Sequence, residues 1–387
     1  MHGGTTPMFE LAALGLLLRA LRRGRLRDYT WTGLAVGIGL CFYVPFRVFP
    51  VIVVVFLLHQ AIVEKGFLHS SWRGLLVMAL ATLLAVAPVA QFALHDPDTF
   101  WGRTRWVSVF VKTPATSWQG IAESTVKHLT MFNYRGDPNP RHNLAGEPML
   151  DPLSGALMVL GVGVCLWRGR QPRSLLLPIW LGIMLLPGIF SQSDEAPHSL
   201  RAIGSMPAAY LLAMVPLDGL IHAWARLPDR RHTTHLTLAL AVLLGGIGYS
   251  NYNTYFERQA KNADSWAAFS TGETLTARLI LELGDSVEYY LPWEYVTISL
   301  TIPFIAGDKI TFQVLDTPDD LPLRQAVNKD VVLIMDAGRR GLYRDAKEYY
   351  PQATWRKWET PFGGLPVLYM VRLTPADVAS ALTQPSK

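Results

Sequence analysis

Apolar runs separated by short polar stretches fill the first two thirds of the chain. A helix needs about 20 mostly apolar residues to cross a bilayer. The runs that approach this length, of which the first three are short, cover residues 6–21, 31–45, 48–63, 74–94, 149–166, 174–191, 206–223 and 235–251. The pattern predicts an α-helical polytopic membrane protein with about eight transmembrane helices.

The residues after about Asn253 show a different pattern, in which apparent strands alternate with helices. The segments that predict strands are 286–292, 296–303, 309–316 and 330–336, followed by a hairpin of 355–362 and 366–373 across two glycines. Helices are expected over the second half of the segment 252–283 and over 339–349. We therefore predict a transmembrane domain over 1–252 and a small α/β domain over 253–387.

Basic residues gather in every second connection between the apolar runs. They are Arg22, Arg23, Arg25 and Arg27, then Lys65 and Arg73, then Arg168, Arg170 and Arg173, and finally Arg226, Arg230 and Arg231. Short loops rich in Lys and Arg stay in the cytoplasm. We therefore expect the connections at 46–48, 95–148 and 192–205 to lie outside the cell (inner) membrane, together with a C-terminal extracytoplasmic domain.

Charge and composition add little beyond this topology. The net charge is +5, and hydrophobic residues make up 50% of the chain. The excess of basic residues is explained by the connections, and no basic-aromatic stripe indicates binding to nucleic acid. The two cysteines, Cys41 and Cys165, lie inside apolar runs, and no Cys pair or Cys/His spacing supports a disulfide or a metal site.

The long connection at 95–148 is predicted to be an amphipathic outer loop. Its tryptophans alternate with Arg103 and Arg105, a pattern typical of segments that lie in the membrane interface. A helix is expected over 100–110, and the turn formers over 133–152 are expected to fold over the outer face. The two arginines either guide an anionic headgroup or provide general attraction to anionic lipid.

Arg47 is the least expected charge in the chain, since it lies between two apolar runs. Pro45 and Pro50 bracket it, so the backbone is predicted to turn tightly between two helices. Ionisable residues at membrane depth are commonly functional. Arg47, with Tyr43 beside it, is therefore a candidate phosphate clamp, and the alternative is an arginine that snorkels to the headgroups.

Arg201 is a second arginine of this kind, just before an apolar run. With His198 it is a candidate phosphate contact, and the alternative is an outer-loop charge paired with Asp194 or Glu195. We expect Arg47 and Arg201 to contribute to one anionic-lipid site.

Asp194 and Glu195 are the acidic residues nearest to this site in the sequence. They are candidates for a base or for a divalent metal ligand, but adjacent side chains point apart on a helix or strand. Asp194 is the best catalytic candidate in the chain, and a divalent metal cofactor stays open.

Several segments together resemble a known family. In order they are TPMFELAALGLLLRALRRGR, GLAVGIGLCFYVPFRVFP, WGRTRWVSVF, NLAGEPMLDPLSGALMVLGV and SLRAIGSMPAAYLL. Over residues 5–260 they resemble the second half of bacterial polyprenyl-phosphate-sugar glycosyltransferases. These are the protein O-mannosyltransferase-like members of glycosyltransferase family 39, in the GT-C superfamily.

The resemblance implies a membrane enzyme that takes a sugar from a polyprenyl-phosphate carrier on the outer face. A carboxylate acts as base on the acceptor, which is a protein, a lipid or a glycan. Basic residues hold the leaving phosphate, and Arg47 and Arg201 match the family's Tyr-x-x-x-Arg and Arg-x-x-x-x-x-Pro patterns.

The chain departs from this family at its start. The family's acidic residue lies in a first outer loop, which precedes the matched segment. We therefore expect an N-terminally truncated sequence or half of a split enzyme, inactive alone. The alternatives are a non-catalytic scaffold or assembly subunit with a partner-binding tail and, ranked last, a transporter.

Overall fold

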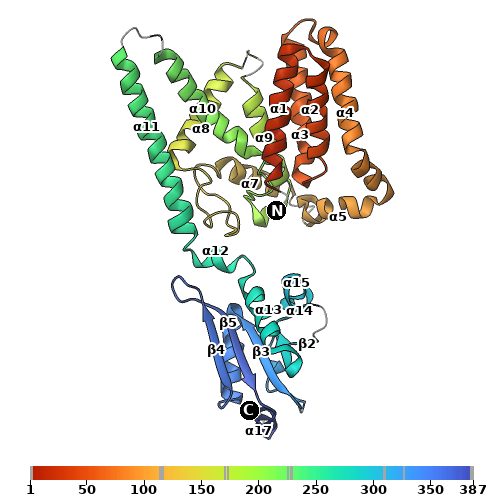
Figure 1. The fold of residues 1–387 in the computed structure, drawn as a ribbon, viewed down its shortest axis with the longest axis vertical. Helices are drawn as coiled ribbons and strands as arrows, with labels where there is room; N and C mark the ends of the chain where they lie inside the picture. Colours follow the sequence, from red (N-terminus) through yellow and green to blue (C-terminus); the bar gives the residue numbers. More distant parts are fainter. Residues whose placement is uncertain are drawn as a thin grey trace. The chain divides into compact units, whose positions relative to one another are not determined.

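The computed structural model describes residues 3–112, 117–169, 171, 174–224, 226, 230–307, 311–325 and 327–383. The chain divides into two compact units, Met1–Thr254 and Tyr255–Lys387 (Figure 1). The sequence predicted a division at 252–253. The first unit is helical and the second combines helices with a small sheet, so each is described by itself.

Each apolar run of the first unit forms a helix. The helices are α1 (Thr5–Arg23), α2 (Leu26–Gly39), α3 (Phe49–Val63), α4 (Phe67–His95), α8 (Pro152–Trp167), α9 (Leu176–Ile189), α10 (Ser205–Trp224) and α11 (Arg230–Tyr252). Between α2 and α3 the chain forms a short 3₁₀ helix, η1 (Val44–Val48), with Pro45 near its start. The predicted tight turn around Arg47 is therefore present.

Fewer helices than predicted are long and apolar enough to cross a membrane. Within the described residues they are Val44–Val63, Phe67–His95 and Ser205–Trp224. Helices α8 and α9 are apolar but shorter, and α1 and α2 carry charged residues such as Glu10 and Asp28. The predicted count of eight spans thus exceeds what length and composition support.

Small residues let the helices of the first unit pack closely. Gly33 and Gly37 on α2 face α4, and a Cβ atom at Gly33 would lie 2.2 Å from the carbonyl oxygen of Met78. On α8, a Cβ atom at Gly161 would lie 1.9 Å from the carbonyl oxygen of Leu212 on α10. Such contacts with backbone atoms cannot be relieved by a change of rotamer.

Replacing Gly161 with valine is expected to destabilise the first unit. The added side chain would collide with the α10 backbone, and overpacking of this kind costs about 1–3 kcal/mol. Gly163 on the same helix provides the matched control, because a Cβ atom added there would meet no other atom within 4 Å. Thermal unfolding in detergent should therefore show a lower Tm for Gly161→Val than for Gly163→Val, and equal values would contradict the packing.

The connections of the first unit lie at opposite ends of its helices. In Figure 1 the turns from α1 to α2 and from α3 to α4 lie at one end, whereas α5 (Pro97–Val107) and α7 (Ser117–Thr130) lie at the other. This arrangement fits the alternation of basic and non-basic connections along the sequence. Which end faces outward stays a prediction.

The predicted helix over 100–110 is interrupted at Ser108. Helix α5 ends at Val107, and a short helix, α6 (Val109–Lys112), follows. Ser108 has an extended backbone and pairs as an isolated antiparallel bridge with Ser191. The backbone of Val109 donates to the carbonyl of Phe190 at 3.1 Å, so the long loop is fixed to the segment after α9.

The second unit is built on a five-stranded mixed sheet of order β2-β1-β3-β5-β4. The strands are β1 (Val287–Leu291), β2 (Phe312–Val314), β3 (Asp330–Asp336), β4 (Thr354–Glu359) and β5 (Pro366–Leu373). Strand β1 is parallel to both β2 and β3, whereas β5 is antiparallel to both β3 and β4.

Both faces of the central strand β3 are buried. Val331 and Leu333 pack with α16 (Arg340–Tyr349) and α17 (Pro375–Leu382), whereas Val332 and Ile334 pack with α13 (Thr271–Leu283) on the other face. This alternation follows from the two-residue period of a strand. The predicted α/β character of the tail is thus present, including the hairpin across Gly363 and Gly364.

The strand predicted over 296–303 is wrong. The chain there forms two short helices, α14 (Trp293–Thr297) and α15 (Thr301–Ala306). Its β-branched residues favour a strand, but Pro303 lacks the N–H that an internal strand needs. Ile302 is instead buried from the helical side, in the cluster that α13 forms with the sheet.

Candidate functional site

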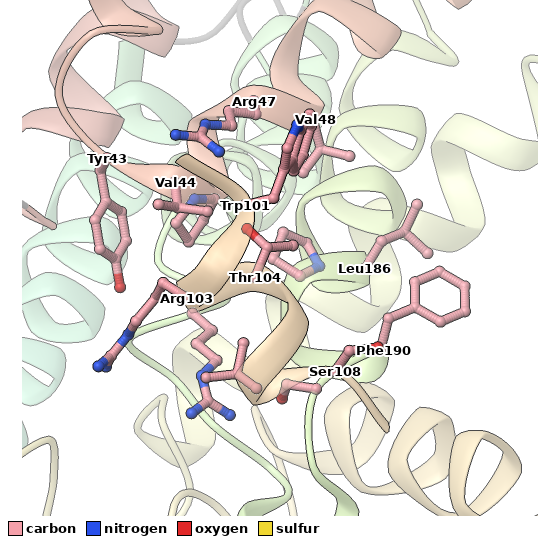
Figure 2. Close-up of a pocket in the computed structure, with 15 residues that line it drawn as sticks. Tyr43, Val44, Arg47, Val48, Trp101, Arg103, Thr104, Ser108, Leu186 and Phe190 are labelled. Carbon is pink, nitrogen blue, oxygen red and sulfur yellow. The ribbon is translucent and has the colours of Figure 1, made fainter. Parts of the chain in front are cut away.

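A cavity of about 430 Å³ lies at the end of the first unit that carries α5. It forms where η1, α5, the end of α9 and the segment after α9 meet. Its lining residues are Tyr43, Val44, Pro45, Arg47, Val48, Trp101, Arg103, Thr104, Val107, Ser108, Leu186, Pro187, Phe190, Ser191 and Arg201. We call it the arginine cavity (Figure 2).

The lining combines positive charge with apolar walls. Arg47, Arg103 and Arg201 all contribute, and none of the described lining residues is a carboxylate. Figure 2 shows Arg47 and Arg103 around the same space as Tyr43, with Leu186 and Phe190 on another side. The cavity therefore suits a ligand with an anionic group and an apolar portion.

Arg47 is held by aromatic rings. Its guanidinium carbon lies 3.8 Å from the centre of the Phe100 ring and 5.7 Å from that of Trp101. Cation–π contacts of this kind orient a guanidinium without satisfying its N–H groups. Nη1 of Arg47 is buried and has no hydrogen-bond partner. The side chain thus packs against α5.

Arg201 reaches the same cavity from the segment before α10. Its Nη2 lies 2.6 Å from a carboxylate oxygen of Glu195, and its side chain is 14% exposed. The pairing alternative raised by the sequence is therefore observed with Glu195, but Nη1 of Arg201 is buried and has no partner. Two arginines thus bring buried, unsatisfied donors to one cavity.

The other predicted site residues divide between the cavity and its surroundings. Tyr43 lines the cavity and donates from its hydroxyl to the Leu200 carbonyl at 3.4 Å. Arg105 does not line it and forms an exposed ion pair with Asp98 at 3.0 Å. Asp194 is exposed in a short 3₁₀ helix, η3 (Ser193–Glu195), outside the lining.

His198 also lies outside the lining, in a polar cluster that the sequence did not predict. The buried Asp137 is at its centre, and one carboxylate oxygen accepts hydrogen bonds from the Ser199 N–H and hydroxyl, both at 2.7 Å. The same oxygen lies 2.9 Å from Nδ1 of His142. The other oxygen accepts from the Asn139 N–H at 2.8 Å.

This environment fixes the ionisation of the cluster. Burial acts to raise the pKa of Asp137, but hydrogen bonds from His142, Asn139 and Ser199 outweigh it and lower the pKa to about 2. Burial lowers the pKa of His198 to about 4, and the charges of Arg201 and His142 act in the same direction. Near neutral pH the carboxylate is therefore charged and the His198 ring is neutral.

The cluster is adjacent to a second cavity, of about 330 Å³. Arg141, His142 and Ser199 contribute polar groups, and the remaining walls are mostly apolar. The segment around Arg201 therefore borders two cavities, since Arg201 lines the first and its neighbours Leu200 and Ala202 line the second.

Glu10 is a further buried carboxylate that the sequence did not single out as a site. It is 0% exposed and accepts a hydrogen bond from the indole N–H of Trp180 at 3.1 Å. Its other oxygen has no partner. It lines neither of the two cavities, so it is not assigned to this site.

Comparison with known proteins adds no family assignment. No protein-family model matches the chain, and a search of curated proteins finds no match. The function is therefore argued from the cavity, its charges and its neighbours.

Proposed function

We propose that this chain is a membrane glycosyltransferase, or part of one, that binds a polyprenyl-phosphate sugar in the arginine cavity. The transfer would pass the sugar, as in mannosyltransferase-like enzymes, to an extracytoplasmic acceptor. The observation that carries the proposal is the pair of buried, unpartnered guanidinium N–H groups of Arg47 and Arg201 in one apolar-walled cavity. An unsatisfied buried donor costs about 1–3 kcal/mol, and an anionic ligand removes that cost.

The chemistry of a polyprenyl phosphate suits this cavity. When the sugar leaves, negative charge grows on the phosphate oxygens, and fixed guanidinium groups in a partly dry site stabilise that charge. The isoprenoid chain is apolar and matches the walls formed by residues such as Leu186 and Phe190. The position of the cavity at the ends of apolar helices allows a membrane lipid to enter from the bilayer.

The proposal takes all eight helices formed by the apolar runs of the first unit as membrane helices. The charged residues of α1 and α2 support this, because Glu10 and Asp28 are 0% exposed and lie inside the protein. Arg19 pairs with Asp28 at 2.8 Å across the two helices. Intramembrane charges commonly face the interior and pair in this way.

A non-catalytic role is the second candidate. No carboxylate lies among the described residues of the cavity lining, and Asp194 is exposed outside it. Transfer to a hydroxyl acceptor needs a base. A scaffold or assembly subunit that binds the lipid donor and presents its α/β tail to a partner would need none.

The proposed topology places the long loop and the α/β unit on the same, extracytoplasmic side. Single cysteines at the exposed positions Glu123 and Ser286 can test it, in a background where Cys41 and Cys165 are replaced by serine. Both should react with a membrane-impermeant maleimide in intact cells. Reaction only after permeabilisation, at either position, would refute the topology.

Activity is tested with the purified chain, a polyprenyl-phosphate hexose and cell-envelope acceptors. Release of free polyprenyl phosphate above that of the Arg47→Ala, Arg201→Ala double variant would establish an enzyme. Donor binding without release would favour the non-catalytic role. A chain that neither binds nor cleaves the donor would refute both candidates.

A further inference from the structure

Three side chains of the kinds that can ligate a metal come from two separate loops and meet beside the second cavity. Asp137 and His142 come from the loop between α7 and α8, and His198 comes from the segment between α9 and α10. Their donor atoms all lie within 4.8 Å of one another. The rings of His142 and His198 are 4.9 Å apart between centroids.

We propose that Asp137, His142 and His198 bind one divalent transition-metal ion of the Zn²⁺ type. Zinc binds imidazole nitrogen and carboxylate oxygen at about 2.0–2.2 Å, which places tetrahedral ligands about 3.4 Å apart. The pair of Asp137 and His142 is already this close, at 2.9 Å. The full set of donor atoms lies within 4.8 Å, so shifts of up to about 1.4 Å bring the remaining separations to this spacing.

The three side chains are largely shielded from water, and Asp137 is 1% exposed. Both histidine side chains are 13% exposed, which leaves them accessible to an ion but largely screened from water.

Neighbouring groups hold the ligands in place. Ser199 and Asn139 donate to Asp137, and the His198 backbone N–H donates to Nε2 of His128 at 3.1 Å. Such outer contacts orient ligands and tune their affinity in metal sites. Three protein ligands leave one position of a tetrahedral ion free, and His142 lines the second cavity, where a small ligand can reach that position.

The donor set distinguishes between classes of metal. Two imidazoles and one carboxylate favour zinc and other first-row transition ions, whereas Mg²⁺ and Ca²⁺ prefer oxygen ligands. The proposal does not depend on sugar transfer, because the three residues lie outside the lining of the arginine cavity. The competing interpretation is a hydrogen-bonded Asp–His–Ser network that joins the two loops without a metal.

The test uses the full-length chain in detergent, with Cys41 and Cys165 replaced by serine to remove thiolate binding. The protein is stripped with a chelator and dialysed against Zn²⁺ or Mg²⁺, and bound metal is measured by mass spectrometry. We expect one Zn²⁺ per chain and no Mg²⁺. His142→Ala and His198→Ala should each lower bound zinc at least tenfold.

His222→Ala is the matched control, since His222 is an exposed histidine on α10 that pairs with Asp218. It should leave bound zinc unchanged. His142→Gln and His198→Gln, which preserve more volume, repeat the measurement if an alanine variant aggregates. The proposal would be overturned if the chain with His142 and His198 intact bound no more zinc than background. It would also be overturned if the His142 and His198 variants bound as much zinc as that chain. Either result would leave the hydrogen-bonded network as the explanation of the cluster.

Discussion

Arg47→Ala and Arg201→Ala should each weaken binding of a polyprenyl phosphate by roughly 10–100-fold. A hydrogen bond between charged partners contributes about 1.5–3 kcal/mol, and each 1.4 kcal/mol is a factor of ten. Each variant removes a guanidinium that lines the arginine cavity and carries a buried, unpartnered N–H. The measurement is the Kd of a short-chain polyprenyl phosphate for the purified protein in nanodiscs of neutral lipid.

Two further variants separate a specific site from general attraction. Arg105→Ala removes one positive charge from the same helix as Arg103, but Arg105 pairs with Asp98 outside the cavity and should leave the Kd unchanged. Arg47→Lys keeps the charge and loses the planar contact with Phe100, so we expect an intermediate Kd. Equal weakening by Arg105→Ala and Arg47→Ala would show that only the overall positive charge matters.

The arginines could be singled out from the sequence, but their cavity could not. A charge between apolar runs and two flanking prolines are local signals, and they predicted the turn at Arg47. The walls come from α5 and α9, which lie far from Arg47 in sequence. Only the folded chain shows that Arg103 faces this space while Arg105, two residues later, does not.

Helices and strands could be predicted from the sequence where the pattern of apolar residues pointed clearly to one type of element. Long apolar runs gave helices, and the buried strand at β3 was recognisable from its continuous apolar residues. The segment at 296–303 is instead helical, and its β-branched residues favour a strand only in the absence of tertiary contacts such as the burial of Ile302. Asp137 and His142 carried no recognisable signal, because they lie five residues apart in an irregular loop and meet His198 through tertiary folding.

Replacing Asp137 with alanine should destabilise the first unit by about 3–5 kcal/mol. Its carboxylate is 1% exposed and accepts hydrogen bonds from two backbone N–H groups and the Ser199 hydroxyl. Removing one partner of a buried charged network leaves the others unsatisfied, which accounts for the expected loss. Thermal unfolding in detergent, with a chelator present so that no metal contributes, measures the change in Tm.

Asp98→Ala is the control, since Asp98 also pairs with a basic side chain but its own side chain is 89% exposed. Exposed ion pairs contribute about 0–1 kcal/mol, so its Tm should stay close to that of the unmodified protein. Asp137→Asn keeps the shape and one acceptor oxygen, and it should fall between the two. Equal Tm values for Asp137→Ala and Asp98→Ala would mean that the loop between α7 and α8 is not held to the segment before α10 by this carboxylate. The position of His142 beside His198 would then need another cause, because Asp137 is the residue that contacts both His142 and Ser199.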